Sequence, residues 1–200
     1  LSSYVDISKQ LLLQNGMGAQ QAIVADLGRA AGAKIDAAMF ATTGTDGGGA
    51  IAATSGVGTF AEASYAANAS IMSDFVEAES VLAQNEGLAG NLSYVANPVL
   101  MKDLKQSAQV AAVSAGIQGN LVNGYPVYYS NGTTKSVGVS GDFLFGDFSK
   151  LYIGMFGGLD ITVDPYSKAI NGEVRLIVNQ YIDWGVTHGA SFVKGTSAIA

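Results

Sequence analysis

The sequence contains no cysteine, a single histidine and very little charge. Without cysteine, the chain forms no disulfide and offers no thiolate for catalysis or metal binding. Charged residues make up 13% of the sequence, whereas ordinary soluble domains contain about 25%. A surface with so few charges is poorly solvated when it stands alone. The composition therefore favours a protein whose surface is largely covered by copies of itself.

The few basic residues are scattered singly, and the net charge is −6. A protein that reads nucleic acid normally carries a basic patch, which this sequence lacks. The best candidate for a membrane span, Gln21–Phe40, contains four charged residues that are costly in hydrocarbon: Asp26, Arg29, Lys34 and Asp36. We therefore expect neither sequence-specific nucleic-acid binding nor membrane insertion.

Helices are predicted in the first half of the chain. Between Met17 and about Phe40, apolar residues recur four apart and so line one helical stripe: Ile23, Leu27, Ala31, Ile35 and Met39. A flexible loop is expected at Gly44–Gly49, and a second helix from about Ala69 to Asn85. After a strand at Leu92–Ala96, Asn97 and Pro98 favour the start of a short helix that ends near Gln106.

Strands are predicted after Gly116, as short aromatic or β-branched runs between Gly and Asp. They are Tyr125–Tyr129, Phe143–Phe145, Leu151–Met155, Leu159–Val163 and the long apolar run Glu173–His188. Asn131-Gly132 and Asn171-Gly172 are turn signals between such runs. Helices followed by strands indicate an α+β fold.

A hydrolase would have to use His188, with Asp183 or Asp160 orienting it. The sequence contains no Gly-x-Ser-x-Gly elbow, so a structural or surface histidine is the preferred interpretation. The pairs Asp142/Asp147 and Asp160/Asp164 lack the spacing of a calcium loop and are interpreted as turn residues. We expect no catalytic, metal-binding or cofactor-binding residues.

Three other patterns are assigned to chance or to packing. Gly47-x-Gly49-x-x-Ala52 matches a loose dinucleotide pattern, but it follows a helix instead of a strand. Asn68, Asn91 and Asn131 begin Asn-x-Ser/Thr triplets, the acceptor pattern for glycosylation. The aromatic residues of Tyr125–Phe156 have no basic neighbours and fit a core and interface better than a nucleic-acid stacking platform.

Five segments, in order, resemble the major capsid proteins of tailed bacteriophages of the Hong Kong 97 type. They are Tyr94–Pro98, Gly124–Val127, Leu144–Ser149, Gly158–Ile161 and the end of the chain from Val174-Arg175 through Ser191–Thr196. The resemblance implies a self-assembling subunit of the icosahedral head that encloses phage DNA. It also implies pentamers and hexamers of the chain, contact with portal or scaffold proteins, synthesis in the bacterial cytoplasm and location in the virion.

The resemblance further implies a phage major capsid fold with two domains. A peripheral domain of residues 1–59 and 158–200 would contain the long "spine" helix over an antiparallel sheet, and residues 60–157 would form a mixed α/β axial domain. The family's N-terminal arm and protruding hairpin loop normally precede the spine helix. Because the sequence starts at Leu1, most of both is expected to be missing, with Leu1–Leu13 long enough only for the return strand of the hairpin.

Two finer expectations follow from the resemblance. Some family members cross-link through an Asn near the position of Asn171, although a turn role is preferred for this residue. The uncharged stretch within Gln106–Asn123 is expected to face a rotation axis. Two alternatives stay open: an encapsulin-like shell around a protein cargo, and a non-catalytic surface or decoration module.

Overall fold

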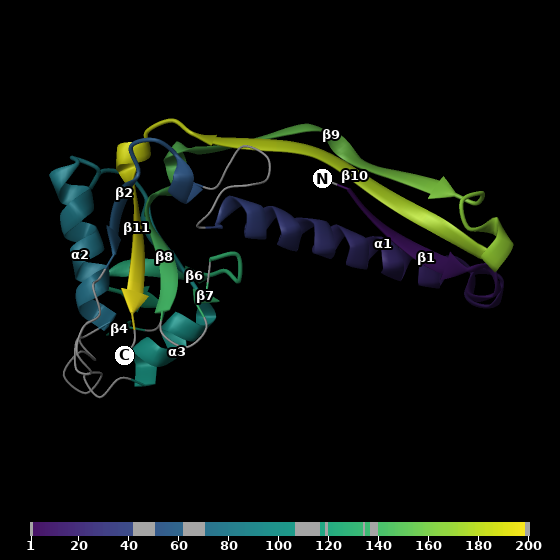
Figure 1. Cartoon of the computed structure of the whole chain (residues 1–200), viewed down its shortest axis with the longest axis horizontal. Coiled ribbons are helices and arrows are strands. Elements are labelled where there is room, and N and C mark those ends of the chain that lie inside the picture. The colour runs from purple at the N-terminus through teal and green to yellow at the C-terminus, as the bar shows by residue number, and fades with distance from the viewer. Residues whose placement is uncertain are drawn as a thin grey trace. The chain divides into compact units, whose positions relative to one another are not determined.

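The computed structural model describes residues 2–41, 51–61, 71–106, 117–118, 120–133, 135–136 and 140–198. The expected loop Gly44–Gly49, Asn68 and most of the expected axis-facing stretch Gln106–Asn123 lie outside these residues. The chain divides into two compact units (Figure 1). The first unit comprises Leu1–Ile35 and Ile153–Asp183, and the second comprises Asp36–Tyr152 and Trp184–Ala200.

The first unit is a three-stranded sheet with a long helix along one face (Figure 1). Its strand order is β1 (Ser2–Ser8), β10 (Glu173–Val186) and β9 (Leu151–Asp164). β1 runs antiparallel to β10. Helix α1 (Lys9–Met39) has 31 residues and is the longest described helix. Ile7 of β1, Leu27 of α1, and Leu176 and Val178 of β10 form a buried cluster, which confirms the expected long helix over a sheet that contains Glu173–His188.

The predicted apolar stripe of α1 is also confirmed. Leu27, Ala31 and Met39 are buried, Ile23 and Ile35 are half-buried, and most of the described residues between them are exposed. The helix begins eight residues before the predicted Met17, directly after β1. The Ser8 hydroxyl accepts a hydrogen bond from the Leu11 N–H at 3.2 Å, and this cap satisfies a helix N–H that would otherwise lack a partner.

Strand β9 corrects a second prediction. Leu151–Met155 and Leu159–Val163 were expected as separate strands, because Gly157 and Gly158 looked like a break. The structure joins them in one strand of 14 residues. Gly157 has a φ of +80°, a conformation that glycine adopts without steric cost. The strand therefore continues through the glycine pair.

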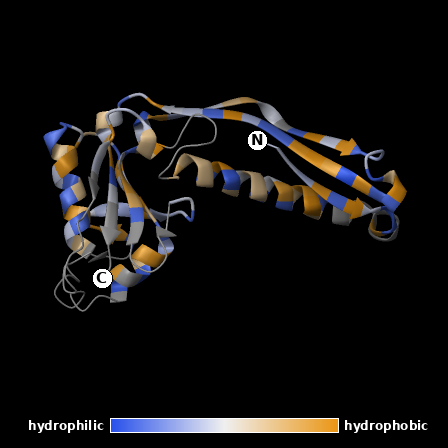
Figure 2. Cartoon of the chain, in the orientation of Figure 1, coloured by the Kyte–Doolittle hydropathy of each residue, from blue (hydrophilic) through white to orange (hydrophobic). Residues whose placement is uncertain are grey.

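Strand β10 ends two residues before the predicted His188, and its first half alternates between buried and half-buried residues. Val174, Leu176 and Val178 are buried, while their neighbours in the strand are only half-buried. Alternate side chains of a strand point to opposite faces, so only the face towards α1 is shielded. Figure 2 shows hydrophobic and hydrophilic residues interleaved along β10.

The second unit contains a mixed, eight-stranded sheet with the order β2-β11-β8-β3-β6-β5-β4, and β7 pairs with β8. β2 is parallel to β11, and β3 is parallel to β6, whereas the other recorded pairs are antiparallel. The strands are β2 (Gly58–Ala61), β3 (Leu92–Ala96), β4 (Ile117–Gln118), β5 (Leu121–Val122), β6 (Tyr125–Tyr129), β7 (Lys135–Ser136), β8 (Ser140–Asp147) and β11 (Phe192–Ala198).

One face of this second sheet is covered by helices, and part of the other face is covered by aromatic side chains. Helices α2 (Ile71–Gln84) and α3 (Pro98–Gln106) pack on one face around a core that includes Phe75, Tyr94, Leu104 and Phe145. On the other face, the Phe148 ring lies edge-on to Phe192 at 5.4 Å between centroids and to Phe40 at 6.4 Å. All five residues of β3 are consequently buried. This packing is typical of the interior of an ordinary globular domain.

Several local predictions in the second unit are confirmed. The Asn97 side chain accepts a hydrogen bond from the Val99 N–H at 2.9 Å, and α3 starts at Pro98. Leu100 and Leu104 are buried, as the short helix predicted. Asn131-Gly132 forms a turn, where a Cβ on Gly132 would meet the Ala37 backbone at 2.9 Å.

The boundaries of the two units differ from the expected 1–59 with 158–200 and 60–157. Residues 36–59 and 184–200 lie in the second unit. The physical reason is β11, which pairs with β2 and β8 and so belongs to the eight-stranded sheet. No helix among the described residues is long and apolar enough to cross a membrane.

Candidate subunit-contact surface

Strand β9 is unusual because nearly all of its described side chains are exposed. Ile153 and Met155 project to one face of the strand and Phe156 to the other, and all three are exposed, Phe156 to 85%. β9 is also the last strand of its sheet. Apolar side chains therefore face solvent on both sides of a long edge strand, which is the arrangement that promotes pairing with another chain.

Natural edge strands normally carry protective residues such as lysine or proline. β9 contains neither, and its only charges are Asp160 and Asp164. Gly157, with a φ of +80°, is the one residue of positive φ among the described residues of the strand. Large exposed apolar patches usually mark interaction sites, so we interpret this edge as one that a partner covers in the assembled protein.

The connection between β9 and β10 forms an ordered tip with apolar residues on the outside. One Asp164 carboxylate oxygen accepts hydrogen bonds from the Tyr166 N–H at 2.8 Å and the Ser167 N–H at 3.2 Å. The Ser167 hydroxyl donates to the other oxygen, and these bonds together lower the pKa of Asp164 below its ordinary value. Tyr166 and Ile170 project from this tied turn into solvent.

The base of the tip is held by charge. Arg175 of β10 donates to Asp6 of β1 through two nitrogens, at 2.7 and 2.9 Å. This hydrogen bonding lowers the pKa of Asp6 and raises that of Arg175. The Arg175 guanidinium also lies over the Tyr4 ring, 4.1 Å from its centroid. The two parallel hydrogen bonds fix the alignment of β1 on β10 at the end of the sheet that carries the tip.

The predicted turn role of Asn171 is confirmed. Its N–H donates to the Lys168 carbonyl at 3.0 Å, within the one-turn helix η3 (Ala169–Asn171). Gly172 follows with a φ of +69°. A cross-linking role for Asn171 stays untested.

The residues considered for catalysis lie on different elements of the fold. His188 is exposed and precedes the one-turn helix η4 (Gly189–Ser191), to which its side chain gives no capping hydrogen bond. Asp160 lies within β9 and Asp183 within β10. Asp142 and Asp160 were expected in turns, and this was wrong, because both lie inside strands.

Asp147 is buried, and it organises the end of β8. Its carboxylate accepts hydrogen bonds from the Asn91 N–H at 3.1 Å, the Ser149 N–H at 3.0 Å and the Ser149 hydroxyl at 2.7 Å. Burial alone would raise the pKa of Asp147, but the bonds from Ser149 and Asn91 outweigh it and lower the pKa. A Cβ on Gly90 would collide with this carboxylate. Asp147 is therefore a structural anchor of a turn, as the sequence predicted for this residue.

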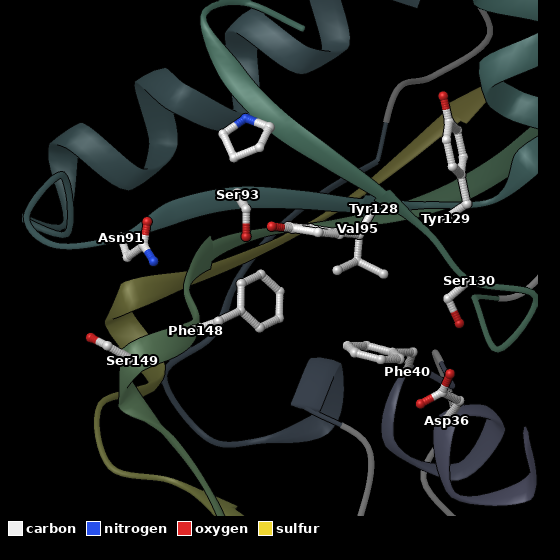
Figure 3. Close-up of a pocket in the computed structure, with 11 residues that line it drawn as sticks. Asp36, Phe40, Asn91, Ser93, Val95, Tyr128, Tyr129, Ser130, Phe148 and Ser149 are labelled. Carbon is white, nitrogen blue, oxygen red and sulfur yellow. The ribbon is translucent and has the colours of Figure 1, made fainter. Parts of the chain in front are cut away.

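The second unit contains a pocket of about 470 Å³ near Phe40 and Phe148 (Figure 3). Its described lining is aromatic and hydroxyl-bearing, with Asp36 as the one charged residue. No histidine stands among the described lining residues, so the serine hydroxyls of the pocket have no imidazole base in that lining. Among the described residues, no three His, Asp or Glu side chains gather as a metal site would require.

A second network, which the sequence did not reveal, joins α2 to the turn between β5 and β6. Glu79 accepts hydrogen bonds from the Asn123 side chain at 2.5 Å and from the Tyr125 hydroxyl at 2.9 Å. Burial, followed by the contact with Glu79, raises the pKa of Tyr125. These residues hold the hairpin of β5 and β6 against α2.

Solved structures with this fold include several shells. The capsid of a native GTA particle matches with a TM-score of 0.75 and 17% identity, over 99% of this chain and 72% of the other. Gordonia phage Cozz matches at TM-score 0.68 and 18% identity, over 98% and 68%. The holo-SrpI encapsulin complex from Synechococcus elongatus matches at TM-score 0.68 and 10% identity, over 98% and 72%.

At these identities the structural matches establish the fold, which is that of phage capsids of the Hong Kong 97 type. No curated protein sequence matches the chain. The sequence model of the phage capsid family matches residues 1–197. With the capsid fold and a match over almost its whole length, the chain belongs to the phage capsid family.

Proposed function

We propose that this chain is the shell-forming part of a major capsid protein, whose copies assemble into the icosahedral head around phage DNA. The observation that carries the proposal is the exposure of apolar side chains on both faces of the edge strand β9, in a member of the phage capsid family. Contacts between identical subunits close into rings when the rotation allows it. The family consists of structural proteins, and we extend this to the chain by assigning it no catalytic role.

The domain roles are part of this proposal. The first unit serves as the peripheral domain, because its thin sheet exposes apolar residues to neighbours. The second unit serves as the axial domain, which gathers around the five- and six-fold centres as pentamers and hexamers. The subunit is made in the bacterial cytoplasm and contacts portal or scaffold proteins during assembly.

The net charge of the chain supports a shell that encloses DNA without recognising its base sequence. The chain has a net charge of −6, so it repels the phosphate backbone and contacts no particular base sequence.

An encapsulin-like shell around a protein cargo is the second candidate, because an encapsulin shares the fold at a TM-score of 0.68. The content of purified particles separates the two. A head contains nuclease-protected DNA, whereas a compartment contains a second protein species. A surface or decoration module would contain neither, since it would not form a shell.

Expression of the full-length gene product, followed by sedimentation and electron microscopy, tests the proposal. We expect closed icosahedral particles. A product that remains monomeric across a range of salt and protein concentrations would overturn the shell function itself.

A further inference from the structure

The pocket near Phe40 and Phe148 lies on the face of the second sheet that α2 and α3 do not cover (Figure 3). Ser93 and Val95 of β3 line it. They alternate with Tyr94, whose ring belongs to the core on the helix side, and alternate residues of a strand point to opposite faces. The volume of about 470 Å³ lies within the range of small-molecule sites, about 300–1,000 Å³. One chain therefore builds a pocket large enough for a small organic ligand.

The Ser93 side chain is directed into this pocket (Figure 3). Ser93 is only 6% exposed, and its hydroxyl forms no hydrogen bond with another described residue. The other serines of the lining are satisfied, since Ser130 accepts from the Gly132 N–H at 3.0 Å and Ser149 donates to Asp147 at 2.7 Å. A buried hydroxyl without a partner is costly. Ser93 therefore has a hydrogen bond to offer to an occupant of the pocket.

The opposite end of the pocket carries its one charged residue, Asp36 (Figure 3). Asp36 lies in the last turn of α1, which contains no basic residue. Its carboxylate forms no ion pair with another described residue. The C-terminal end of a helix carries partial negative charge, which disfavours a carboxylate and favours a cation. The helix end and Asp36 together therefore attract a positively charged group.

Aromatic rings line the pocket between these two ends. Phe40 and Phe148 meet edge to face at 6.4 Å between centroids, and Phe148 is held in turn against Phe192 at 5.4 Å. Tyr128 adds a third ring, which is 59% exposed. The faces of such rings attract cations and pack against other flat groups. The lining therefore fits a flat apolar body with a positive charge at one end.

We propose that this pocket binds a small organic cation, an aromatic amine whose ring packs between Tyr128 and Phe148. The ammonium of the ligand faces Asp36, and a hydroxyl at the other end of the ligand forms a hydrogen bond with Ser93. All of these residues belong to the second unit of one chain. The proposal is consequently independent of the shell function, and its failure would leave that function intact.

Titration of unassembled full-length subunits with tyramine tests the site, with binding followed by NMR signals of the ligand. Tyramine has the ammonium, the ring and the hydroxyl. Tyrosol has a neutral hydroxyl in place of the ammonium, and phenethylamine lacks the ring hydroxyl. We expect tyramine to bind saturably with a dissociation constant on the order of 1 mM, as its small size allows. Tyrosol should bind about two- to fivefold more weakly, because it forms no ion pair with the exposed Asp36.

Two substitutions assign the ends of the ligand. Asp36→Asn should reduce the affinity for tyramine to that for tyrosol and leave tyrosol binding unchanged. Its matched control is Asp26→Asn, an exposed position of α1 outside the pocket lining that removes the same charge, and it should change neither affinity. Ser93→Ala should weaken tyramine binding about two- to tenfold, as loss of one hydrogen bond does. The same change should leave phenethylamine binding unaffected, because phenethylamine has no hydroxyl to pair with Ser93.

Absence of saturable tyramine binding to the unaltered protein would overturn this inference. Equal affinities for tyramine and tyrosol would also overturn it, since the ammonium would then contribute nothing. Equal losses with Asp36→Asn and Asp26→Asn would contradict a local site, because net charge alone would explain the binding. If Ser93→Ala weakened phenethylamine as much as tyramine, the proposed hydrogen bond would be wrong.

Discussion

The two units of the chain differ in how many faces of their sheets are covered. In the second unit, α2 and α3 cover one face and a cluster of phenylalanines covers part of the other, so that β3 is buried throughout. In the first unit, α1 covers one face of β1 and β10, and β9 is exposed on both faces. The second unit buries a large core of its own, whereas most of the large exposed apolar side chains among the described residues belong to the first unit.

The comparison indicates that different apolar residues of the chain stabilise the folded subunit and the assembled shell. Burial of apolar area inside the subunit stabilises the fold. Apolar area left on an edge strand contributes to stability only after a partner has arrived. Substitutions in the two units should therefore affect different measurements, and three predictions test this.

The largest expected effect comes from a matched pair of phenylalanine substitutions. Phe145 is completely buried and stacks on Tyr94 at 4.1 Å between centroids, whereas Phe156 is exposed. We expect Phe145→Ala to lower the free energy of unfolding by about 3–5 kcal/mol, and Phe156→Ala to change it by less than about 0.5 kcal/mol. Urea denaturation of the unassembled subunits measures both. Equal losses would contradict the division of roles.

An intermediate effect is expected at Asp147. Asp147→Ala leaves the Asn91 and Ser149 N–H groups without their acceptor and should cost about 1–3 kcal/mol. The matched control is Asp142→Ala on the same strand, which is half-buried and should cost less.

Asp147 should also make the second unit sensitive to acid. Its folded pKa is lowered, so its contribution is fully present above the unfolded value of about 3.9 and is lost as the pH falls through the folded pKa. Denaturation curves between pH 7 and pH 2 should therefore converge for the unaltered protein and Asp147→Ala. A difference that stays constant down to pH 2 would contradict this assignment.

The smallest expected effect is a gain in the first unit. No atom lies within 4 Å of the Cβ positions at Gly28 and Gly32 in α1, so alanine fits at both. Each substitution should stabilise the helix by up to about 1 kcal/mol. Thermal unfolding of the subunits measures the gain. A loss of stability at either position would show that the glycine has a structural role within the chain.

The sequence predicted the parts of the fold that depend on local periodicity. The stripe of α1 follows from apolar residues four apart, and α3 from Asn97 and Pro98. The start of α1 at Lys9 was missed, because its cap at Ser8 is a single hydroxyl with no pattern around it. β9 was divided in two because Gly157 and Gly158 look like a turn when the strand beside them is unknown.

The sequence indicated that the chain has a surface for contact with other copies, but it did not indicate which residues form that surface. Low charge indicated a surface covered by copies, yet no local pattern identified β9 as an edge strand. That assignment depends on the pairing of β10 with β1 on its other side, with Asp6 opposite Arg175. These two residues are 169 positions apart, and only the folded chain brings them together. The two compact units likewise depend on long-range pairing, since β11 joins a sheet made from distant segments.

Sedimentation of the full-length protein with Phe156→Asp tests the central claim most directly. The substitution places a charge on the exposed face of β9 without touching the core of either unit. We predict that this variant unfolds at the same urea concentration as the unaltered subunit but sediments as unassembled subunits, while the unaltered protein sediments as closed particles. Closed particles from Phe156→Asp, formed as readily as those of the unaltered protein, would contradict the claim that β9 exposes its apolar residues for assembly.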